Sequence, residues 1–376
     1  MAPRRILVVG NYPADQQQSM IRFAHLLVSL YQPYAQVHLI QPFVLVTRLP
    51  GLPAVARKYL AYIDKLLLFP LWLALRARSY EMVHIADHSN AFYAFCCPQK
   101  RCIVTCHDLL AVRGAMGDST VACDASAFGL WLQKLIVAGL RRCAAVAFIS
   151  HATFRDFHHL IGEPRGQRHA VIPLPLNAPF RPDPDPFGLS SNEQALLPSD
   201  PFILMVGSAL PRKNRPLGLR LLQELGVASP YRLVFAGAPL APADQSFVAE
   251  HQLTSRVHVI ERPSHALLNH LYCRAHALLF PSLAEGFGWP LIEAQACGCP
   301  VIASTTTSIP EVAGEAALYA GPHDVATFAS HVRALEDQAL RARLIRQGEL
   351  NLRRYDPEVI RLAYIRFALQ PAQIPA

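Results

Sequence analysis

The stretch from Phe280 to Gly314 reads FPSLAEGFGWPLIEAQACGCPVIASTTTSIPEVAG, and it decides the fold of the second half of the chain. The apolar run from Ala277 to Phe280 suits a buried parallel strand. Pro290 favours a first helical position, because the backbone N–H that proline lacks would have no partner there. Gly298 then ends the helix, and a second apolar run begins at Cys299. The stretch therefore predicts a strand, a glycine-rich loop, a helix and another strand.

The loop between the first strand and the helix has the features of an anion site. Gly286 and Gly288 have no β-carbon, so a ligand can approach the backbone closely. The helix start that follows offers unpaired amides and a partial positive charge to a phosphate. Glu285 in the loop and Glu293 in the first turn of the helix are eight positions apart, so we expect both carboxylates to face one pocket.

Length and composition restrict the class of protein. At 376 residues the chain exceeds what one hydrophobic core usually serves, so two domains are expected. Hydrophobic residues make up 52% and charged residues 16%, which excludes disorder as the main state. The net charge of +8 suits nucleic acid, an acidic membrane surface or a diphosphate as partner. Because no basic stripe with interleaved aromatic residues occurs, nucleic acid is not expected.

The cysteines do not indicate a metal site. They are nine, an odd number, without paired metal-ligand spacing, so we interpret them as reduced cytosolic thiols. Cys102, Cys106 and His107 are close in sequence, but RCIVTCHD alternates like a strand and no second ligand cluster follows. No metal is predicted.

One apolar stretch bears on membranes. Leu66 to Leu75 is interrupted by Pro70 and flanked by Lys65 and Arg76. A spanning helix needs about 20 apolar residues, so this stretch does not span a bilayer. Two interpretations stay open, a helix lying on an anionic membrane surface and a helix packed in the core. MAPRR before ILVVG does not resemble a secretory signal. We therefore expect a cytoplasmic location, with peripheral contact at the inner face of the membrane as an open alternative.

Strand-like and helix-like runs alternate along both halves of the chain, which predicts an α/β fold with two doubly wound, Rossmann-like domains. We expect the first domain over residues 1–180 and the second over residues 201–355. Between them, residues 181–200 are rich in Pro, Asp and Ser and suit a linker. Residues 356–376 have helical periodicity. In open parallel sheets, ligands bind at the carboxyl ends of the strands.

The segment EGFGWPLIEAQACGCPVIAS resembles the donor signature of retaining GT-B glycosyltransferases of the family-four type, the glycosyl transferases of group 1. The resemblance includes both glutamates, the glycine-bracketed Phe287, the Gly-x-Pro-Val run and the trailing run from Ile309 to Gly314. It implies two domains that face each other across a cleft, with the acceptor side in the first and nucleotide-sugar binding in the second. It also implies that the final helix returns toward the first domain.

A basic turn supplies a second expected anion site. Arg212 and Lys213 follow the strand-like run Phe202 to Val206, so they should lie at the carboxyl edge of the sheet. Arginine can grip two phosphate oxygens with its planar guanidinium, and lysine adds a compact charge. In the resembled family such a pair holds the donor phosphates. Because this pair neutralises a leaving diphosphate, no divalent metal should be needed.

The resemblance assigns further roles to the second domain. The amides of Gly286, Phe287 and Gly288 would hold phosphate, and Glu293 would accept hydrogen bonds from the ribose hydroxyls. Glu285 would orient the transferring sugar, or stabilise it as positive charge develops at its anomeric carbon. The nucleoside diphosphate sugar is a substrate here, and no cofactor is expected.

Polar residues at two strand ends are candidates in the first domain. His107 and Asp108 follow the run Ile103 to Cys106, and by resemblance His107 would reach the sugar or the acceptor. A lone histidine at a strand end is also a common structural residue, and that interpretation stays open.

Two further groups are expected near the acceptor. Asp87, His88 and Asn90 end the preceding strand-like run at the same edge. In the loop after the first strand only Gly10 remains of the family's adjacent glycines, so Asp15, Gln16 and Ser19 suit acceptor recognition or helix capping.

We therefore expect a hexosyltransferase that moves a hexose to a hydroxyl in surface or extracellular polysaccharide biosynthesis. The expected partners are a nucleotide sugar, a glycan or lipid-linked glycan acceptor, and an anionic membrane surface. The PRKN form of the basic turn favours a mannosyl- or rhamnosyl-type enzyme. Two alternatives remain, a GT-B nucleotide-sugar epimerase and a catalytically inactive nucleotide-binding module, although the intact glutamate and basic pairs weigh against both.

Overall fold

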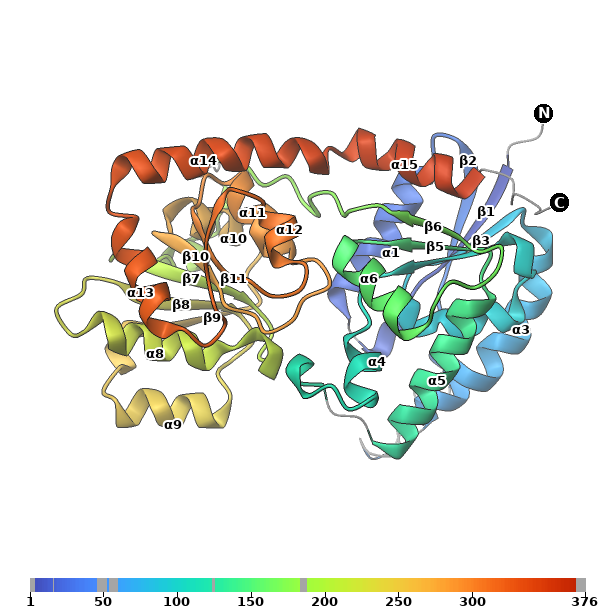
Figure 1. Cartoon of the computed structure of the whole chain (residues 1–376), viewed down its shortest axis with the longest axis horizontal. Coiled ribbons are helices and arrows are strands. Elements are labelled where there is room, and N and C mark those ends of the chain that lie inside the picture. Colours follow the sequence, from blue (N-terminus) through green and yellow to red (C-terminus); the bar gives the residue numbers. More distant parts are fainter. Residues whose placement is uncertain are drawn as a thin grey trace. The chain divides into compact units, whose positions relative to one another are not determined.

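The chain forms two compact units in a computed structural model that describes residues 4–15, 17–45, 53, 60–123, 126–182 and 188–369 (Figure 1). Unit 1 contains Met1–Gly117, Asp124–Pro173 and Pro357–Ala376, and unit 2 contains Asp118–Cys123 and Leu174–Asp356. Each unit has its own hydrophobic core and one six-stranded parallel sheet with helices on both faces. The predicted doubly wound α/β class is confirmed.

The sheet of unit 1 has the strand order β2-β1-β3-β4-β5-β6. Its strands are β1 (Arg4–Val9), β2 (Ala35–Ile40), β3 (Met82–Ile85), β4 (Cys102–Cys106), β5 (Ala145–Phe148) and β6 (Arg168–Val171). Its helices are α1 (Gln18–Tyr31), the π-helix η3 (Asp64–Leu68), α3 (Phe69–Arg76), the 3-10 helix η5 (His88–Cys96), α4 (Leu110–Ala115), α5 (Ala127–Arg142), α6 (His151–Leu160) and α15 (Pro357–Leu369).

Helices cover both faces of this sheet. On one face α1 packs against α15, where the rings of Phe23 and Tyr364 lie 6.4 Å apart. On the other face α3, η5 and α5 share a core that includes Phe69 and Ile136. Gly139 allows α5 to approach η5 closely, since a β-carbon there would lie 2.2 Å from the Ala91 carbonyl oxygen. This packing fixes the η5 segment beside the end of β3.

The apolar stretch from Leu66 to Leu75 forms the end of η3 and most of α3. Phe69 and Leu73 are fully buried, which supports the core-packing interpretation for one face of the helix. Leu67, Leu71 and Leu75 are exposed on another. None of the helices in the described part of the chain combines the length and apolar character needed to cross a lipid bilayer.

The sheet of unit 2 has the strand order β12-β11-β10-β7-β8-β9. Its strands are β7 (Phe202–Gly207), β8 (Arg232–Gly237), β9 (Val257–Glu261), β10 (Ala277–Phe280), β11 (Val301–Ser304) and β12 (Ala317–Ala320). Its helices are α7 (Ser191–Ala195), α8 (Arg215–Leu225), α9 (Pro242–Glu250), α10 (His265–Arg274), α11 (Trp289–Ala296), α12 (Ile309–Ala313), α13 (Val325–Ala334) and α14 (Gln338–Leu352). Figure 1 shows α8 and α9 on one face of this sheet and α10 to α12 on the other.

Each sheet has one point at which the strand order reverses. In unit 2 the chain runs from β7 toward β8 on one side and from β10 toward β11 on the other, so the switch lies between β7 and β10. In unit 1 the switch lies between β1 and β3. Ligands of open α/β sheets bind outside the carboxyl ends of the strands at such switch points. A ligand of either unit is therefore expected at the loops after β7 and β10, or at the loops after β1 and β3.

Two local expectations differ from the structure. Ser19 does not cap a helix, because α1 begins at Gln18 and its N-cap residue is Gln17. Glu293 is the fifth residue of α11 and lies beyond the first turn, since the helix begins at Trp289. Gln16 lies outside the described residues.

Candidate functional site

Arg212 and Lys213 both bind the carboxylate of Glu285 across the switch point of unit 2. Nη1 of Arg212 lies 2.7 Å from Oε2 of Glu285, and Nζ of Lys213 lies 2.6 Å from Oε1. The two cations belong to the short 3-10 turn η9 (Pro211–Lys213) after β7, and the carboxylate belongs to the loop after β10. The structure therefore brings together three of the residues that the sequence singles out.

All three charges of this cluster are largely sequestered from solvent. Glu285 is 6% exposed. Burial raises the pKa of Glu285, but the charges of Lys213 and Arg212 outweigh that effect and hold the pKa below its ordinary value. Burial lowers the pKa of Lys213, and the attraction of Glu285 opposes this shift. At neutral pH the cluster thus holds one anion between two cations, which leaves an excess positive charge for an anionic ligand.

Backbone contacts hold the two loops of the cluster together. The amide of Leu283 donates to the carbonyl oxygen of Arg212 at 2.8 Å. The amide of Glu285 donates to Oγ1 of Thr307 at 2.9 Å, and Oγ of Ser308 donates to the Glu285 carbonyl oxygen at 2.9 Å. The position of the carboxylate is therefore set by the segment after β11 as well as by its own loop.

Asn214 fixes the basic turn, and the sequence analysis did not identify it. Its backbone is in the left-handed region, with φ of 53°, directly before α8. Its Nδ2 donates to the carbonyl oxygens of Pro281 at 3.1 Å and Pro322 at 2.7 Å. Asparagine tolerates this conformation better than most residues, and an asparagine after a basic pair and before Arg215-Pro216 is the signal that was available.

Gly288 is needed at the start of α11 for two reasons. Its φ is +101°, a conformation that side chains rarely adopt. A β-carbon there would lie 3.0 Å from Cδ1 of Leu291 and 3.3 Å from the Phe280 ring. The glycine thus allows the loop to turn directly into the helix, whose first amides have no intrahelical acceptors.

Glu293 is held by a different contact. It is 4% exposed, and the hydroxyl of Tyr272 on α10 donates to its Oε2 at 2.8 Å. Burial and the neighbouring Glu293 charge raise the pKa of Tyr272, so the hydroxyl keeps its proton. Tyr272 in turn packs edge-to-face against Phe180, with ring centroids 5.7 Å apart.

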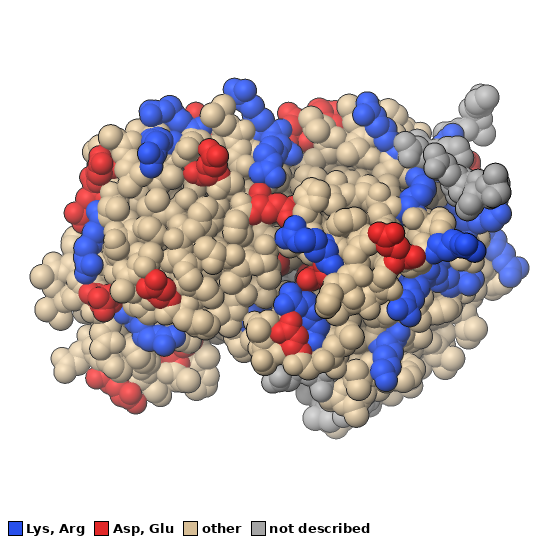
Figure 2. Space-filling view, in the orientation of Figure 1, with Lys and Arg blue, Asp and Glu red and all other residues tan. Residues whose placement is uncertain are grey.

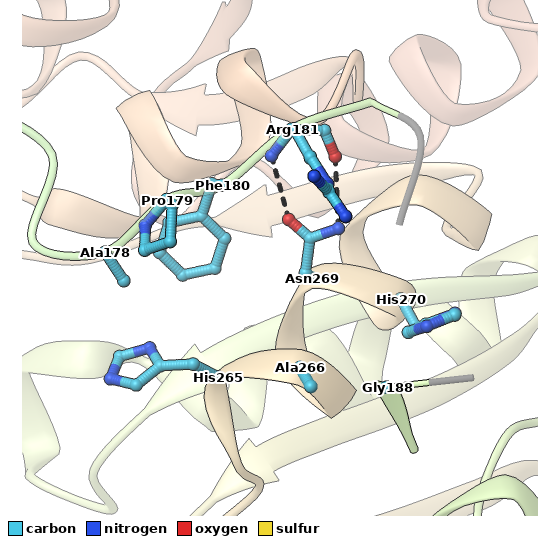
Figure 3. Close-up of a pocket in the computed structure, with 9 residues that line it drawn as sticks. All are labelled: Ala178, Pro179, Phe180, Arg181, Gly188, His265, Ala266, Asn269 and His270. Atoms are coloured by element: carbon cyan, nitrogen blue, oxygen red, sulfur yellow. Dashed lines mark hydrogen bonds between the residues drawn. The ribbon is translucent and has the colours of Figure 1, made fainter. Parts of the chain in front are cut away.

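Phe180 lines a hollow of about 310 Å³ where residues 178–181 cross α10 (Figure 3). Asn269 anchors the crossing segment, because its Oδ1 accepts from the Arg181 amide at 2.9 Å and its Nδ2 donates to the Arg181 carbonyl oxygen at 3.0 Å. The ring of His265 faces Phe180 across the hollow. The hollow is therefore linked to Glu293 through Phe180 and Tyr272.

In unit 1, His107 is buried at the end of β4. Its Nε2 lies 2.9 Å from the Ala86 carbonyl oxygen, and its ring packs edge-on against Phe23. A carbonyl oxygen can only accept, so Nε2 carries the proton and Nδ1 is an acceptor. Within the described residues Nδ1 has no hydrogen-bond partner. Burial lowers the pKa of His107, so the ring is neutral at neutral pH.

Asp87 is the centre of the polar cluster after β3. Burial raises the pKa of Asp87, but a hydrogen bond and charge from His88 outweigh burial and hold the pKa far below its ordinary value. Asp87 also accepts from the amide and hydroxyl of Ser89 and from Nδ2 of Asn11. Asp108 lies near the same cluster, 4.0 Å from His88.

The cysteines and histidines of the described residues do not gather into a metal site. Cys102 and Cys106 are fully buried in the core of unit 1. None of the nine cysteines, all of which lie in described residues, forms a disulfide. In the same part of the chain no cluster of three or more His, Cys, Asp or Glu side chains could hold a metal ion.

A family model described as "Glycosyl transferases group 1" matches residues 189–350, which contain the Arg212, Lys213 and Glu285 cluster. Over nearly its whole length the chain has the fold of known GT-B enzymes. Sucrose-phosphate synthase from Thermosynechococcus elongatus superimposes with a TM-score of 0.73 at 19% identity, covering 96% of this chain and 97% of that one. This chain belongs to the GT-B glycosyltransferases of group 1. The predicted family is confirmed.

Other proteins similar to this GT-B chain have names that refer to the synthesis of surface glycans. WaaG, a glycosyltransferase involved in lipopolysaccharide biosynthesis, has a TM-score of 0.68 at 15% identity, covering 97% of this chain and 99% of that one. O-antigen chain mannosyltransferase B of Escherichia coli is 45% identical over 75 residues, 20% of each chain. The serotype-specific mannosyltransferase WbdA of Escherichia coli is 30% identical over 276 residues, 69% of this chain and 32% of that protein. The chain thus spans about a third or less of these two curated relatives.

Proposed function

We propose that this chain transfers a hexose, mannose or a close relative, from a nucleoside diphosphate sugar to a hydroxyl of a growing surface glycan. The observation that carries the proposal is the pair of cations on Glu285 at the switch point of unit 2. Two cations and one carboxylate leave a net positive site beside glycine-opened backbone and a helix start, which suits a diphosphate. Mannose is favoured because two curated relatives are named mannosyltransferases.

The donor side of the reaction would be carried by unit 2. Arg212 and Lys213 would neutralise the charge that develops on the departing diphosphate, with the amides of Gly286, Phe287 and Gly288 binding the same group. Because these fixed cations supply the electrostatic stabilisation, the proposal needs no divalent metal. Glu293, held by Tyr272 in a largely buried position, would accept hydrogen bonds from the ribose hydroxyls.

The transfer is proposed to retain the anomeric configuration. Glu285 is anchored through both oxygens, so it would act as an oriented negative charge near the anomeric carbon rather than as a covalent nucleophile. The leaving phosphate would take the proton of the incoming hydroxyl, and the new bond would form on the face from which the phosphate departs. This is the mechanism that the family resemblance implies, and Glu285 is the only protein group that it uses in this step.

Unit 1 would supply the acceptor side. His107 presents a neutral ring whose Nδ1 has no partner among the described residues, so it can accept a hydrogen bond from a sugar or acceptor hydroxyl. A buried polar atom without a partner calls for an explanation such as a ligand or water. We therefore propose that a sugar or acceptor hydroxyl is the missing partner of Nδ1 of His107.

The proposal includes contact between unit 1 and an anionic membrane surface. Ile63, Leu67, Leu71 and Leu75 repeat every four residues from the residue before η3 to the end of α3, and they are 39%, 56%, 64% and 72% exposed. Residues four apart lie on one helix face, so these side chains form one exposed aliphatic stripe. We call Ile63, Leu67, Leu71 and Leu75 the leucine stripe.

Charge supports an anionic lipid surface as the partner of the leucine stripe. Arg76 and Arg78 are exposed at its carboxyl end. Figure 2 shows Lys and Arg side chains over the visible face of unit 1 around α3 and α5, with few acidic side chains among them. An apolar stripe with basic flanks is the arrangement by which helices lie in a membrane interface. A lipid-linked acceptor would be reached from that position.

The enzymatic proposal is tested by donor turnover. Purified protein is incubated with GDP-mannose, UDP-glucose and other nucleotide sugars, with and without a glycan acceptor, and release of nucleoside diphosphate is measured. We expect acceptor-dependent release that Arg212→Ala with Lys213→Ala abolishes and that Arg346→Ala, an exposed control in α14, leaves unchanged. Sugar rearrangement without an acceptor would instead identify an epimerase, and donor binding without turnover would identify an inactive module.

A further inference from the structure

A cavity of about 490 Å³ lies among the helices of unit 1, outside the sheet. It is walled by α4 with the residue that follows it, by one face of α5, and by single residues near the ends of η5 and α6. α5 contacts both α4 and η5, and Figure 1 shows α4 next to α5. The cavity is larger than the hollow beside Phe180, and its volume is in the range of small-molecule sites.

The walls of this cavity are mainly hydrocarbon. Val112 belongs to the core of unit 1, and Val137 and Leu160 pack against that core. Phe95 and Met116 line the cavity as well, but they are 49% and 63% exposed. The cavity therefore extends from the core of unit 1 to the surface, where large apolar side chains face solvent.

Few side chains of this cavity can form strong hydrogen bonds. Among the described residues that line it, only Gln133, Lys134 and Arg141 have amide or charged groups. A peptide or a glycan would bring many polar groups against the remaining walls, and burial of a polar group without a partner is unfavourable. A hydrocarbon chain has no such groups, and each methylene that it buries favours binding. The walls therefore suit an occupant that is apolar along most of its length.

The charges of the cavity are all positive. Lys134 and Arg141 are both exposed and lie two helical turns, about 10 Å, apart on one face of α5. Arg141 donates to the carbonyl oxygen of Ile161 at 3.1 Å, but within the described part of the chain neither cation forms an ion pair. The described lining contains no acidic residue, and neither does α5. An anionic group at the cavity mouth would thus meet two cations and no carboxylate of the lining.

Aromatic residues on the same helix indicate where such an occupant would come from. Phe128 and Trp131 are 46% and 51% exposed, and their rings stack with centroids 5.5 Å apart. Trp131 precedes Lys134 by three positions, so the indole and the ammonium group lie on one side of α5. Exposed tryptophan beside basic residues is typical of helices at a membrane interface. A lipid of the membrane is therefore favoured over an amphiphile free in solution.

We propose that this cavity binds one hydrocarbon chain of an anionic membrane lipid, whose head group lies against Lys134 and Arg141. The leucine stripe would lie on the bilayer surface, whereas the cavity would take up a single lipid molecule from the bilayer. The inference concerns no step of the sugar transfer, so it can fail or hold independently of the donor site. It adds a lipid-binding site to the proposed contact of unit 1 with the membrane.

Single-chain lipids test this assignment in the absence of a bilayer. Lysophosphatidylglycerols of increasing chain length, each below the concentration at which it forms micelles, are titrated into the full chain and followed by calorimetry. We expect the affinity to rise about fourfold with each added methylene until the chain fills the cavity, and then to stay constant. Lysophosphatidylcholine of the same length has no net charge and should bind about three- to tenfold more weakly. A rise that continues without a limit, or equal affinity for the two head groups, would overturn the proposal.

Two variants locate the binding. Ala138→Trp adds an indole at an exposed position of α5 that lines the cavity, and it should weaken binding of the longest chain at least tenfold. Lys134→Gln with Arg141→Gln should remove the preference for the anionic head group. Ala249→Trp, at an exposed alanine of α9 in unit 2, and Arg22→Gln, at an exposed arginine of α1, are the matched controls and should bind like the parent. Melting curves check that each variant is folded. Absence of lipid binding to the folded parent, or parent-like binding by both folded cavity variants, would overturn the lipid site.

Discussion

Nζ of Lys213 lies 2.6 Å from Oε1 of Glu285, although 72 positions separate the two residues in the chain. Arg212 occupies the other oxygen of the same carboxylate at 2.7 Å. One buried carboxylate therefore organises both cations before any phosphate arrives. Organisation of charge ahead of the reaction is what makes electrostatic stabilisation of a leaving group effective.

Loss of the Glu285 charge should lower the free energy of unfolding of unit 2 at neutral pH, and the loss should become smaller in acid. The folded pKa of Glu285 is below its ordinary value, so its pairing stabilises the fold above about pH 4.3 and this stability is lost as the pH falls. Glu285→Gln should lower the free energy of unfolding by roughly 1–3 kcal/mol at pH 7, with a smaller difference below pH 4. Denaturant unfolding between pH 3 and 7 measures this. Glu349→Gln, at an exposed position in α14, is the control, and equal losses for both variants would refute the role of the ion pair.

His84 should make unit 1 sensitive to acid. Its ring is fully buried between the Tyr31 hydroxyl at 2.9 Å and the Thr105 hydroxyl at 2.8 Å. Burial lowers its pKa to about 3, so the unfolded chain takes up a proton near pH 6.5 that the folded chain does not. Stability should thus fall by up to about 1.4 kcal/mol per pH unit as the pH decreases from 6.5 toward 3. His84→Gln should flatten this slope in melting curves recorded from pH 7 to 5. An unchanged slope, or the same change in the exposed control His25→Gln, would contradict the assignment.

Gly288→Ala should impair donor binding more than a comparable glycine substitution elsewhere. Both Gly288 and Gly226 have positive φ, of 101° and 81°, so alanine strains the backbone at either position. Only at Gly288 would the added β-carbon meet close neighbours, Cδ1 of Leu291 at 3.0 Å and the Phe280 ring at 3.3 Å, while open space surrounds Gly226. Calorimetry with GDP-mannose should show at least tenfold weaker binding for Gly288→Ala and parent-like binding for Gly226→Ala. Similar affinities for the two variants would show that the loop start does not contribute to the donor site.

Membrane contact through the leucine stripe is tested with vesicles. Leu71→Glu combined with Leu75→Glu should reduce co-sedimentation with phosphatidylglycerol vesicles at low salt by at least tenfold, since each buried leucine contributes about 1.5–3 kcal/mol. Leu350→Glu, at a leucine 56% exposed in α14, should have no effect. High salt should weaken parent binding by screening the basic flanks. Failure of the parent to bind, or equal binding of the stripe variant and the control, would remove the membrane from the account.

Much of the fold was predictable because it depends on local patterns. The strands β7 and β10 were identified from short apolar runs. The short helix α7 was missed inside the segment expected to be a linker, although Ser190 and Glu193 form a capping box whose S-x-x-E spacing is visible in the sequence. The linker was predicted from its Pro, Asp and Ser content alone, whereas the capping pattern would have predicted the start of a helix.

The candidate site was predictable in part. The basic pair and the Glu285 loop were each identified from their places after strands, but their ion pairs could not be, because contacts across 72 and 73 positions depend on strand order. In the sheet β10 lies beside β7, and this strand order cannot be read from the sequence pattern.

The most direct test of the central claim is donor affinity measured by calorimetry with GDP-mannose and UDP-glucose on the parent, on Arg212→Ala with Lys213→Ala, and on the control Arg346→Ala. Two charge-assisted contacts to phosphate contribute about 1.5–3 kcal/mol each, so the double variant should bind its donor at least a hundredfold more weakly while Arg346→Ala matches the parent. Parent-like donor affinity in the double variant would contradict the account.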